Sequence, residues 1–514
     1  MIGDERMGRE WSVVSGELEP ATNSLLPLFR IKEYFQGQKS INRTTSLTTD
    51  HSQLTCQNGI KFEINFFNTS QVKDISNQRF SLFHMREQAP CILIVIWILF
   101  TFGFLSSCQQ NPSDKQKTPK AVFIIVDGIS ADVIEKLNPP ALEEISNTGA
   151  YTRAYVGGEK GTYTETPTIS AVGYNSLLTG TWVNKHNVWG NNIKDPNYHY
   201  RDIFRIAEEY NPQLKTAIFS TWTDNRTKLV GEGLQQTNNL KLDHKFDGLE
   251  LDTVNYPHDD NSDYIHKIDE AVAEEAARYI GKQGPDLSWV YLQYTDDMGH
   301  RHGDDDKFHE AIRIADRQVG RVWDAIKKRE REFDEDWLIV ITTDHGRDSV
   351  SGKHHGGQSA REMMTWIVTN AANLNERFQQ TPAMVDIMPS ICNHMNIPLP
   401  EAVKMEIDGI PFIGPADLSD LSAETANGKI VLKWKDLSDD PEAKAEIFVS
   451  ETNHFRTGGE DEYRSVGETL ISLENFTLDL DANKFYKILI KGPDHYANVW
   501  VAPDLSQTAE NLDP

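Results

Sequence analysis

Short apolar segments alternate with amphipathic helical patterns through the middle of this chain, and this alternation constrains the fold more than any other feature. Five segments rich in β-branched and aromatic residues are predicted to be buried strands: Lys120–Val126, Lys215–Ser220, Leu287–Tyr294, Trp337–Thr343 and Thr365–Thr369. Helical patterns lie between them, for example over Ser262–Gly281 and Lys307–Lys328. The sequence therefore predicts an α/β domain, in which helices cover both faces of a mostly parallel sheet.

Acids and histidines follow several of the predicted strands. A single aspartate after a strand is usually a turn residue or a helix cap. In parallel sheets, however, ligands bind beyond the carboxyl ends of the strands, and carboxylates and imidazoles are typical ligands of zinc-like divalent ions. The residues concerned are Asp127, Asp296, His300, Asp344, His345 and His355. Taken together, they predict a metal site at this edge of the sheet.

The order and spacing of these residues resemble the alkaline phosphatase superfamily, and within it the type I phosphodiesterase/nucleotide pyrophosphatase family. The resemblance covers residues 120–415 and implies an alkaline phosphatase-like catalytic domain. In that family a nucleophile opens a helix ten residues before the Gly of a Thr-Gly pair, a position that Ser170 occupies here. An Asn follows in a His-x-x-x-x-Asn pattern, which His186 and Asn191 match. Thr168 is the alternative nucleophile.

The resemblance implies a phosphoric ester hydrolase with two divalent metal ions, expected to be zinc, and a phosphoseryl intermediate. Two such ions can stabilise both the attacking and the leaving oxygen of a phosphoryl transfer. Asn191 would donate a hydrogen bond to the developing charge. His354 competes with His355 as a ligand. One ion would contact Asp127, Asp344, His345 and the oxygen of Ser170, and the other would contact Asp296, His300 and His355.

Two positions help to choose among branches of the superfamily. Sulfatases need a Pro and an Arg after the modified residue, where this chain has Val172 and Tyr174. Asp296 and His300 match an Asp-x-x-x-His element of the superfamily. Three-metal alkaline phosphatases have a Glu five residues before the Asp of this element, where this chain has Tyr291. Tyr291 is similar to the phosphodiesterase branch and favours small phosphodiester or nucleotide pyrophosphate substrates. The alternatives are a phosphomonoesterase on the same site and a catalytically idle surface binding lipoprotein.

Side chains that contact the rest of a substrate leave a weaker sequence signal. Lys185, Arg226 and Lys228 follow the predicted nucleophile and are interpreted as exposed surface charges. Trp222 is equally consistent with a base-stacking platform and with a core residue. The net charge of −26 argues against a nucleic-acid polymer as partner, since such proteins need a basic face. No particular protein partner is predicted.

The first part of the chain does not contribute to this net charge. Residues 1–84 contain nine acidic and nine basic residues and show no sustained helical or strand period. We expect them to be a non-native N-terminal extension, with Met85 as the native start.

A lipoprotein signal is predicted over residues 85–107. Arg86 precedes an apolar run, Cys91–Leu105, which is too short for a bilayer span but fits a signal-peptide core. The following Ser-Ser-Cys resembles a bacterial lipobox, so Cys108 would carry the lipid. Residues 108–119 would then be a polar tether. The expected location is the bacterial cell envelope, where lipid would anchor the protein in the periplasm or at the cell surface.

The last part of the chain, residues 416–514, changes to a β pattern. Short strand-like runs such as Lys429–Trp434 and Phe485–Lys491 are separated by turn signals, and helical periods disappear. Other expected strands are Glu446–Ser450, Thr469–Leu473, Asn475–Leu480 and Asn498–Val501. The pattern predicts an all-β sandwich that resembles a fibronectin type III-like module.

Overall fold

Residues 117–502 are described by a computed structural model. The predicted extension, the signal peptide, Cys108 and most of the tether lie outside the described residues. The chain divides into two units, residues 1–108 and 109–514, and everything below concerns the second. Among the helices described, none is both long and apolar enough to cross a membrane.

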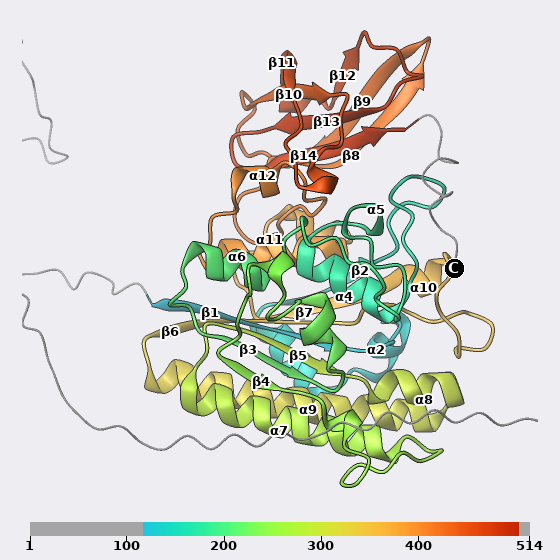
Figure 1. The fold of residues 1–514 in the computed structure, drawn as a ribbon, viewed down its shortest axis with the longest axis vertical. Helices are drawn as coiled ribbons and strands as arrows, with labels where there is room; N and C mark the ends of the chain where they lie inside the picture. Colours follow the sequence, from blue (N-terminus) through green and yellow to red (C-terminus); the bar gives the residue numbers. More distant parts are fainter. Residues whose placement is uncertain (1–116, 503–514) are drawn as a thin grey trace, which may run out of the picture. The chain divides into compact units, whose positions relative to one another are not determined.

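A seven-stranded sheet forms the centre of the first domain, in the order β2-β7-β6-β1-β5-β3-β4 (Figure 1). Strands β6, β1, β5, β3 and β4 run parallel, while β7 and β2 are antiparallel at one edge. The prediction of a mostly parallel α/β sheet is therefore confirmed. The strands are β1 (Thr118–Val126), β2 (Ala150–Tyr155), β3 (Thr216–Ser220), β4 (His244–Phe246), β5 (Leu287–Leu292), β6 (Glu335–Thr342) and β7 (Met364–Thr369).

Helices cover both faces of this sheet (Figure 1). Alternate residues of β1 enter separate hydrophobic cores because successive strand side chains point to opposite faces. Phe123 and Ile125 pack with the helices of one face, while Val122 and Ile124 pack with those of the other. The first face carries α4 (Ser170–Thr179), α6 (Ile203–Tyr210) and α11 (Ile387–His394), and the second carries α2 (Ala131–Leu137), α3 (Pro140–Thr148), α7 (Asp263–Gln283) and α9 (Asp306–Glu332).

Several short helices complete the domain, and one of them corrects a predicted boundary. Strand β5 ends at Leu292, so Tyr294 belongs to a helix and not to the strand. The buried Asp269 carboxylate accepts hydrogen bonds from the backbone N–H groups of Gln293 and Tyr294, at 3.1 and 2.8 Å. This contact from α7 caps the new helix where it begins. The short helices are α5 (Val183–His186), α8 (Tyr294–His302), α10 (Ala360–Met363) and α12 (Glu401–Lys404).

The C-terminal part folds as two antiparallel sheets, β11-β10-β13-β14 and β12-β9-β8. The run Thr469–Leu473 is only partly a strand, because β11 ends at Leu470 and a 3-10 turn follows. Strand β8 has a mostly polar and partly exposed sequence, and no prediction covers it. The strands are β8 (Leu418–Ala426), β9 (Lys429–Asp436), β10 (Lys444–Ser450), β11 (Arg464–Leu470), β12 (Asn475–Leu478), β13 (Tyr486–Lys491) and β14 (Tyr496–Val501).

Lys185 connects the region of the seven-stranded sheet with the C-terminal β-sheets, and its interpretation as an exposed surface charge is wrong. Its side chain is fully buried. The ammonium donates to Asp408 Oδ1 at 2.6 Å, to the Glu406 carbonyl at 2.7 Å and to Asn498 Oδ1 of β14 at 2.8 Å. The charge is hidden because a strand more than three hundred residues away covers it.

Candidate metal centre

The parallel register of the sheet brings three segments with predicted ligands to one edge. Val126 pairs with Leu292, and Ile125 pairs with Thr342, so β1, β5 and β6 end side by side. Asp127 follows β1 directly, and helix α8 begins just after β5. Thr343-Asp344-His345 continue from β6. The predicted acids and histidines therefore emerge at the same place in the fold.

Asp296, His300 and His355 form the first candidate metal group. Asp296 and His300 lie one turn apart on α8, with His300 Nε2 3.3 Å from Asp296 Oδ2. His355 Nε2 lies 3.0 Å from His300 Nε2 and 3.9 Å from Asp296 Oδ1. These are the three residues that the sequence assigned to one ion. The competing His354 is exposed and belongs to neither candidate group.

Asp127, Asp296 and His345 form the second candidate group. His345 Nε2 lies 3.4 Å from Asp127 Oδ1 and 3.3 Å from Asp344 Oδ2. The sequence analysis assigned Asp344, and not Asp296, to the same ion as Asp127 and His345. Asp344 is not in this group but lies beside His345. Asp296 thus belongs to both groups, and the two candidate ion positions are neighbours.

Two carboxylate oxygens in this cluster have no hydrogen-bond partner although they are buried: Asp127 Oδ1 and Asp344 Oδ2. Burial, with the charges of Asp344 and Asp296, raises the pKa of Asp127 well above its usual range. Burial and the charge of Asp296 raise the pKa of Asp344 to about 7. Buried carboxylates are stable when paired with cations, and oxygen and imidazole donors together suit zinc-type ions. The residues present therefore fit divalent metal ions.

In His345 and His355, a hydrogen bond from Nδ1 to a backbone carbonyl turns Nε2 toward the cluster. His345 Nδ1 donates to the Gly346 carbonyl at 2.9 Å. His355 Nδ1 donates to the Thr168 carbonyl at 2.8 Å. Burial lowers the pKa of both imidazoles, so both favour the neutral form that binds metals.

Two tyrosines orient Asp127. The sequence analysis did not predict this role for either of them. The hydroxyl groups of Tyr174 and Tyr291 both donate to Asp127 Oδ2, the second at 2.7 Å. Only Oδ1 then faces His345. Tyr174 lies one helical turn after Ser170 on α4, and this spacing was the signal that could have identified it.

Ser170 is the first residue of α4, and its Oγ lies 3.4 Å from His345 Nε2. Asn191 Oδ1 accepts a hydrogen bond from the Ala171 N–H at 3.0 Å, which places the Asn191 amide beside the same helix end. The hydroxyl of Thr168 is already engaged, since it donates to the Gly357 carbonyl and accepts from the Gly356 N–H. The Thr168 hydroxyl is thus bonded to the loop 356–357, whereas the Ser170 hydroxyl faces His345.

Residues farther along the chain have mainly structural contacts. Trp222 is half-buried and packs edge-on against Tyr174, with ring centroids 6.5 Å apart. Arg226 is not the exposed surface charge that was expected, because Asp247 and Glu232 hold it in a partly buried ion-pair network. None of these contacts involves a predicted metal ligand.

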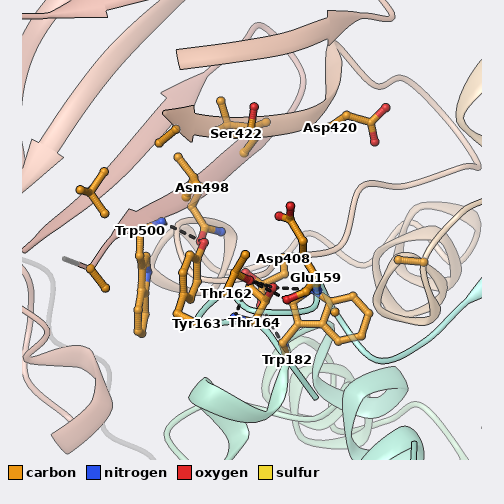
Figure 2. Close-up of a pocket in the computed structure, with 18 of the residues that line it drawn as sticks. Glu159, Thr162, Tyr163, Thr164, Trp182, Asp408, Asp420, Ser422, Asn498 and Trp500 are labelled. Atoms are coloured by element: carbon orange, nitrogen blue, oxygen red, sulfur yellow. Dashed lines mark hydrogen bonds between the residues drawn. The ribbon is translucent and has the colours of Figure 1, made fainter. Parts of the chain in front are cut away.

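A cavity of about 1060 Å³ lies between the loop 158–164 and the β-sandwich. Figure 2 shows Glu159 and Trp182 on one side of it and Ser422 on the other. Tyr163 stacks on Trp500 at a centroid distance of 5.2 Å, and its hydroxyl accepts from the Trp500 N–H. None of the predicted site residues lines this cavity, so it is separate from the metal centre.

The sequence matches the family described as "Type I phosphodiesterase / nucleotide pyrophosphatase" over residues 121–408. Among curated proteins, it is 21% identical over 261 residues to bis(5′-adenosyl)-triphosphatase enpp4 of Xenopus laevis, covering 49% of this chain and 52% of that protein. It is 21% identical over 254 residues to ectonucleotide pyrophosphatase/phosphodiesterase family member 1 of Mus musculus, covering 48% and 26%. The chain thus spans about half the length of the first relative and about a quarter of the second.

Among solved structures, the chain is similar to phosphonate monoester hydrolase of Agrobacterium radiobacter, with 13% identity and a TM-score of 0.41. That match covers 77% of this chain and 91% of the other. A second match, to phosphonoacetate hydrolase of Sinorhizobium meliloti, has 18% identity and a TM-score of 0.32, and covers 45% and 57% of the two chains.

Proposed function

This chain belongs to the type I phosphodiesterase/nucleotide pyrophosphatase family, and from that premise we propose that it hydrolyses phosphodiester or nucleotide pyrophosphate bonds of small molecules. The reaction would run through a phosphoseryl intermediate on Ser170 with two divalent ions in the cluster. One observation carries this proposal: the Ser170 hydroxyl opens a buried helix beside two candidate metal groups that share Asp296.

The first group would hold one ion through Asp296, His300 and His355. The other ion would be held by Asp127 and His345 of the second group together with Asp344, and the shared Asp296 would reach this ion as well. When bound, such ions supply Lewis-acid stabilisation of phosphoryl oxygens and lower the pKa of a contacting hydroxyl. Zinc is the proposed metal because the donors are imidazole nitrogens and carboxylate oxygens.

The chain's own groups would then carry out the transfer. Ser170 Oγ would attack the phosphorus, and the helix N-terminus at which Ser170 lies would favour the negative charge of the phosphate. Asn191 would use its amide N–H to bind another oxygen, because its Oδ1 is occupied by the Ala171 N–H. In the first step a bond forms between Ser170 Oγ and phosphorus while the alcohol or phosphate leaving group departs, and in the second step water releases the remaining phosphate monoester from Ser170.

A diester preference is supported by Tyr291. At the position where three-metal phosphomonoesterases have a Glu, this chain has a tyrosine whose hydroxyl donates to Asp127. A neutral hydroxyl there supplies no charge for a third ion.

The cellular setting is a separate proposal that rests on the sequence. We propose that residues 85–107 are a lipoprotein signal and that lipid on Cys108 anchors the protein in a bacterial cell envelope. The C-terminal sandwich would be a fibronectin type III-like module.

A substrate comparison tests the proposed reaction. Purified protein with added zinc is expected to hydrolyse bis-p-nitrophenyl phosphate faster than p-nitrophenyl phosphate. Faster release from p-nitrophenyl phosphate would instead support the phosphomonoesterase alternative. Hydrolysis of neither ester, nor of a panel of nucleotides, would support an idle binding protein.

A further inference from the structure

Arg347 is fully buried among the candidate ligands, and the proposed mechanism does not use it. Its guanidinium contacts three different segments. Nε donates to the Gly128 carbonyl at 2.7 Å, and Nη1 donates to the Lys353 carbonyl at 3.3 Å. Nη2 donates to the Asp296 carbonyl at 2.9 Å and also to Asp296 Oδ1. One side chain therefore donates hydrogen bonds to the segment after β1, to the loop after β6 and to helix α8.

Two glycines make room for this guanidinium. A Cβ atom at Gly299 would lie 2.1 Å from Arg347 Cζ, and a Cβ atom at Gly128 would lie 2.6 Å from Arg347 Nη2. The Phe308 ring lies 5.5 Å from the Arg347 Cζ atom. The site is therefore shaped for a planar group with several donors, which lysine cannot replace.

Each segment that Arg347 contacts carries a candidate metal ligand. Gly128 follows Asp127, Lys353 precedes His355 by two residues, and Asp296 is itself a ligand. Asp296 is also the residue shared by the two candidate groups. We propose that Arg347 is a positioning residue that fixes the Asp296 carboxylate for both ions and thereby couples the two metal sites. This inference rests on the proposed function.

The charge of Arg347 and its geometry predict opposite effects on metal binding. A positive charge next to two cations repels them, so a role through charge alone would make Arg347→Gln bind zinc more tightly. Positioning predicts weaker binding, because Asp296 loses the contacts that orient it. Arg347→Lys keeps the charge but cannot make all of the contacts. Positioning therefore predicts weaker binding for this variant also, whereas a charge effect predicts no change.

The test is a titration of the metal-free full chain with zinc alone, which needs no substrate. We expect Arg347→Gln and Arg347→Lys each to lose about 10–100-fold in zinc affinity. The matched control is Arg329→Lys, since Arg329 is also buried and pairs with Glu335 at the opposite end of β6. Its zinc affinity should equal that of the wild type.

A second variant covers the case in which Arg347 variants fail to fold. Gly299 lies inside α8, where alanine is favourable for the helix, yet its methyl group would displace the guanidinium. Gly299→Ala should show the same loss of zinc affinity. Unchanged or tighter binding by Gly299→Ala and by the folded Arg347 variants would overturn the inference alone. A wild-type protein that binds no zinc would overturn the proposed function and the inference with it.

Discussion

His300 Nε2 lies 3.0 Å from His355 Nε2, although His300 is on a helix after β5 and His355 is in the loop after β6. Two neutral ring nitrogens that face each other repel unless a proton or a cation lies between them. The Nδ1 atom of His355 is already committed to the Thr168 carbonyl. His355 Nε2 therefore has a free lone pair, which can accept a hydrogen bond from His300 Nε2 or bind a cation together with His300 and Asp296.

His300→Ala should remove one of the two metal ions. Its removal leaves Asp296 and His355 alone in the first group, which is too few donors for a stable zinc site. His302→Ala is the control on the same helix, because His302 lies in neither candidate group. Metal content measured by mass spectrometry after dialysis should fall by one ion per chain for His300→Ala only. Equal metal content in the two variants would contradict the assignment.

Tyr291→Phe should weaken zinc binding by about tenfold, because residues that orient a ligand typically contribute that much. The substitution removes the 2.7 Å donation to Asp127 Oδ2 and retains the packing of the ring. Competition with a chromophoric chelator measures the change. Tyr151→Phe removes an exposed hydroxyl that donates to Glu135 and should leave affinity unchanged. A Tyr291→Phe variant that binds zinc like the wild type would show that Tyr174 alone holds Asp127.

The metal-free protein should lose stability as the pH rises. Burial and the nearby Asp296 raise the pKa of Asp344 to about 7 in the folded state. Unfolded aspartate has a pKa of about 3.9, so the folded state binds more protons between about pH 4 and about pH 7. The free energy of unfolding should therefore fall as the pH rises through this window.

Zinc should reverse this trend, because it binds the deprotonated carboxylates and its affinity rises with pH. Denaturant unfolding with chelator and with zinc measures both slopes. Asp344→Asn should reduce the slope of the metal-free protein, while the buried Asp202 and Asp269, whose pKa values are also raised to about 7, keep part of it. A metal-free protein that gains stability across the window, with no effect of Asp344→Asn, would contradict the prediction.

Lys185→Met should destabilise the protein by about 3–5 kcal/mol, since it leaves a buried carboxylate of Asp408 without its partner. The double variant Lys185→Met/Asp408→Asn should recover part of this loss. Lys228→Met is the control, because Lys228 is half-exposed, pairs with Asp224 on the surface and should contribute less than about 1 kcal/mol. Urea unfolding measures all three. Equal stability of the two single variants would contradict the buried role of Lys185.

The proximity of the candidate ligands could be predicted from the sequence because the geometry of parallel sheets is regular. Asp127 and Asp344 follow buried strands in register, so their proximity depends only on which strands are neighbours. Asp296 and His300 are brought together by helical spacing alone. These relationships are local or repeat in every sheet of this class.

The remaining contacts depend on long-range packing that no local pattern encodes. Arg347 reaches Asp296 only because Gly128 and Gly299 lack side chains at the point of contact. Lys185 is covered by Asn498, which lies on β14 of the C-terminal β-sheets. The sequence places Tyr174 one helical turn after Ser170, but its contact with Asp127 depends on how α4 packs against the end of β1. Such contacts require the assembled fold.

If Ser170 is the nucleophile, it carries a phosphoryl group during turnover, and this group can be trapped. Wild-type protein with zinc would be mixed with bis-p-nitrophenyl phosphate, quenched in acid and analysed by peptide mass spectrometry. On Ser170 we expect a phosphoryl group that still carries one p-nitrophenyl ester, with none in Ser170→Ala and a normal signal in Thr168→Val if that variant folds. The same group on Thr168, or full turnover by Ser170→Ala, would contradict the assignment of Ser170.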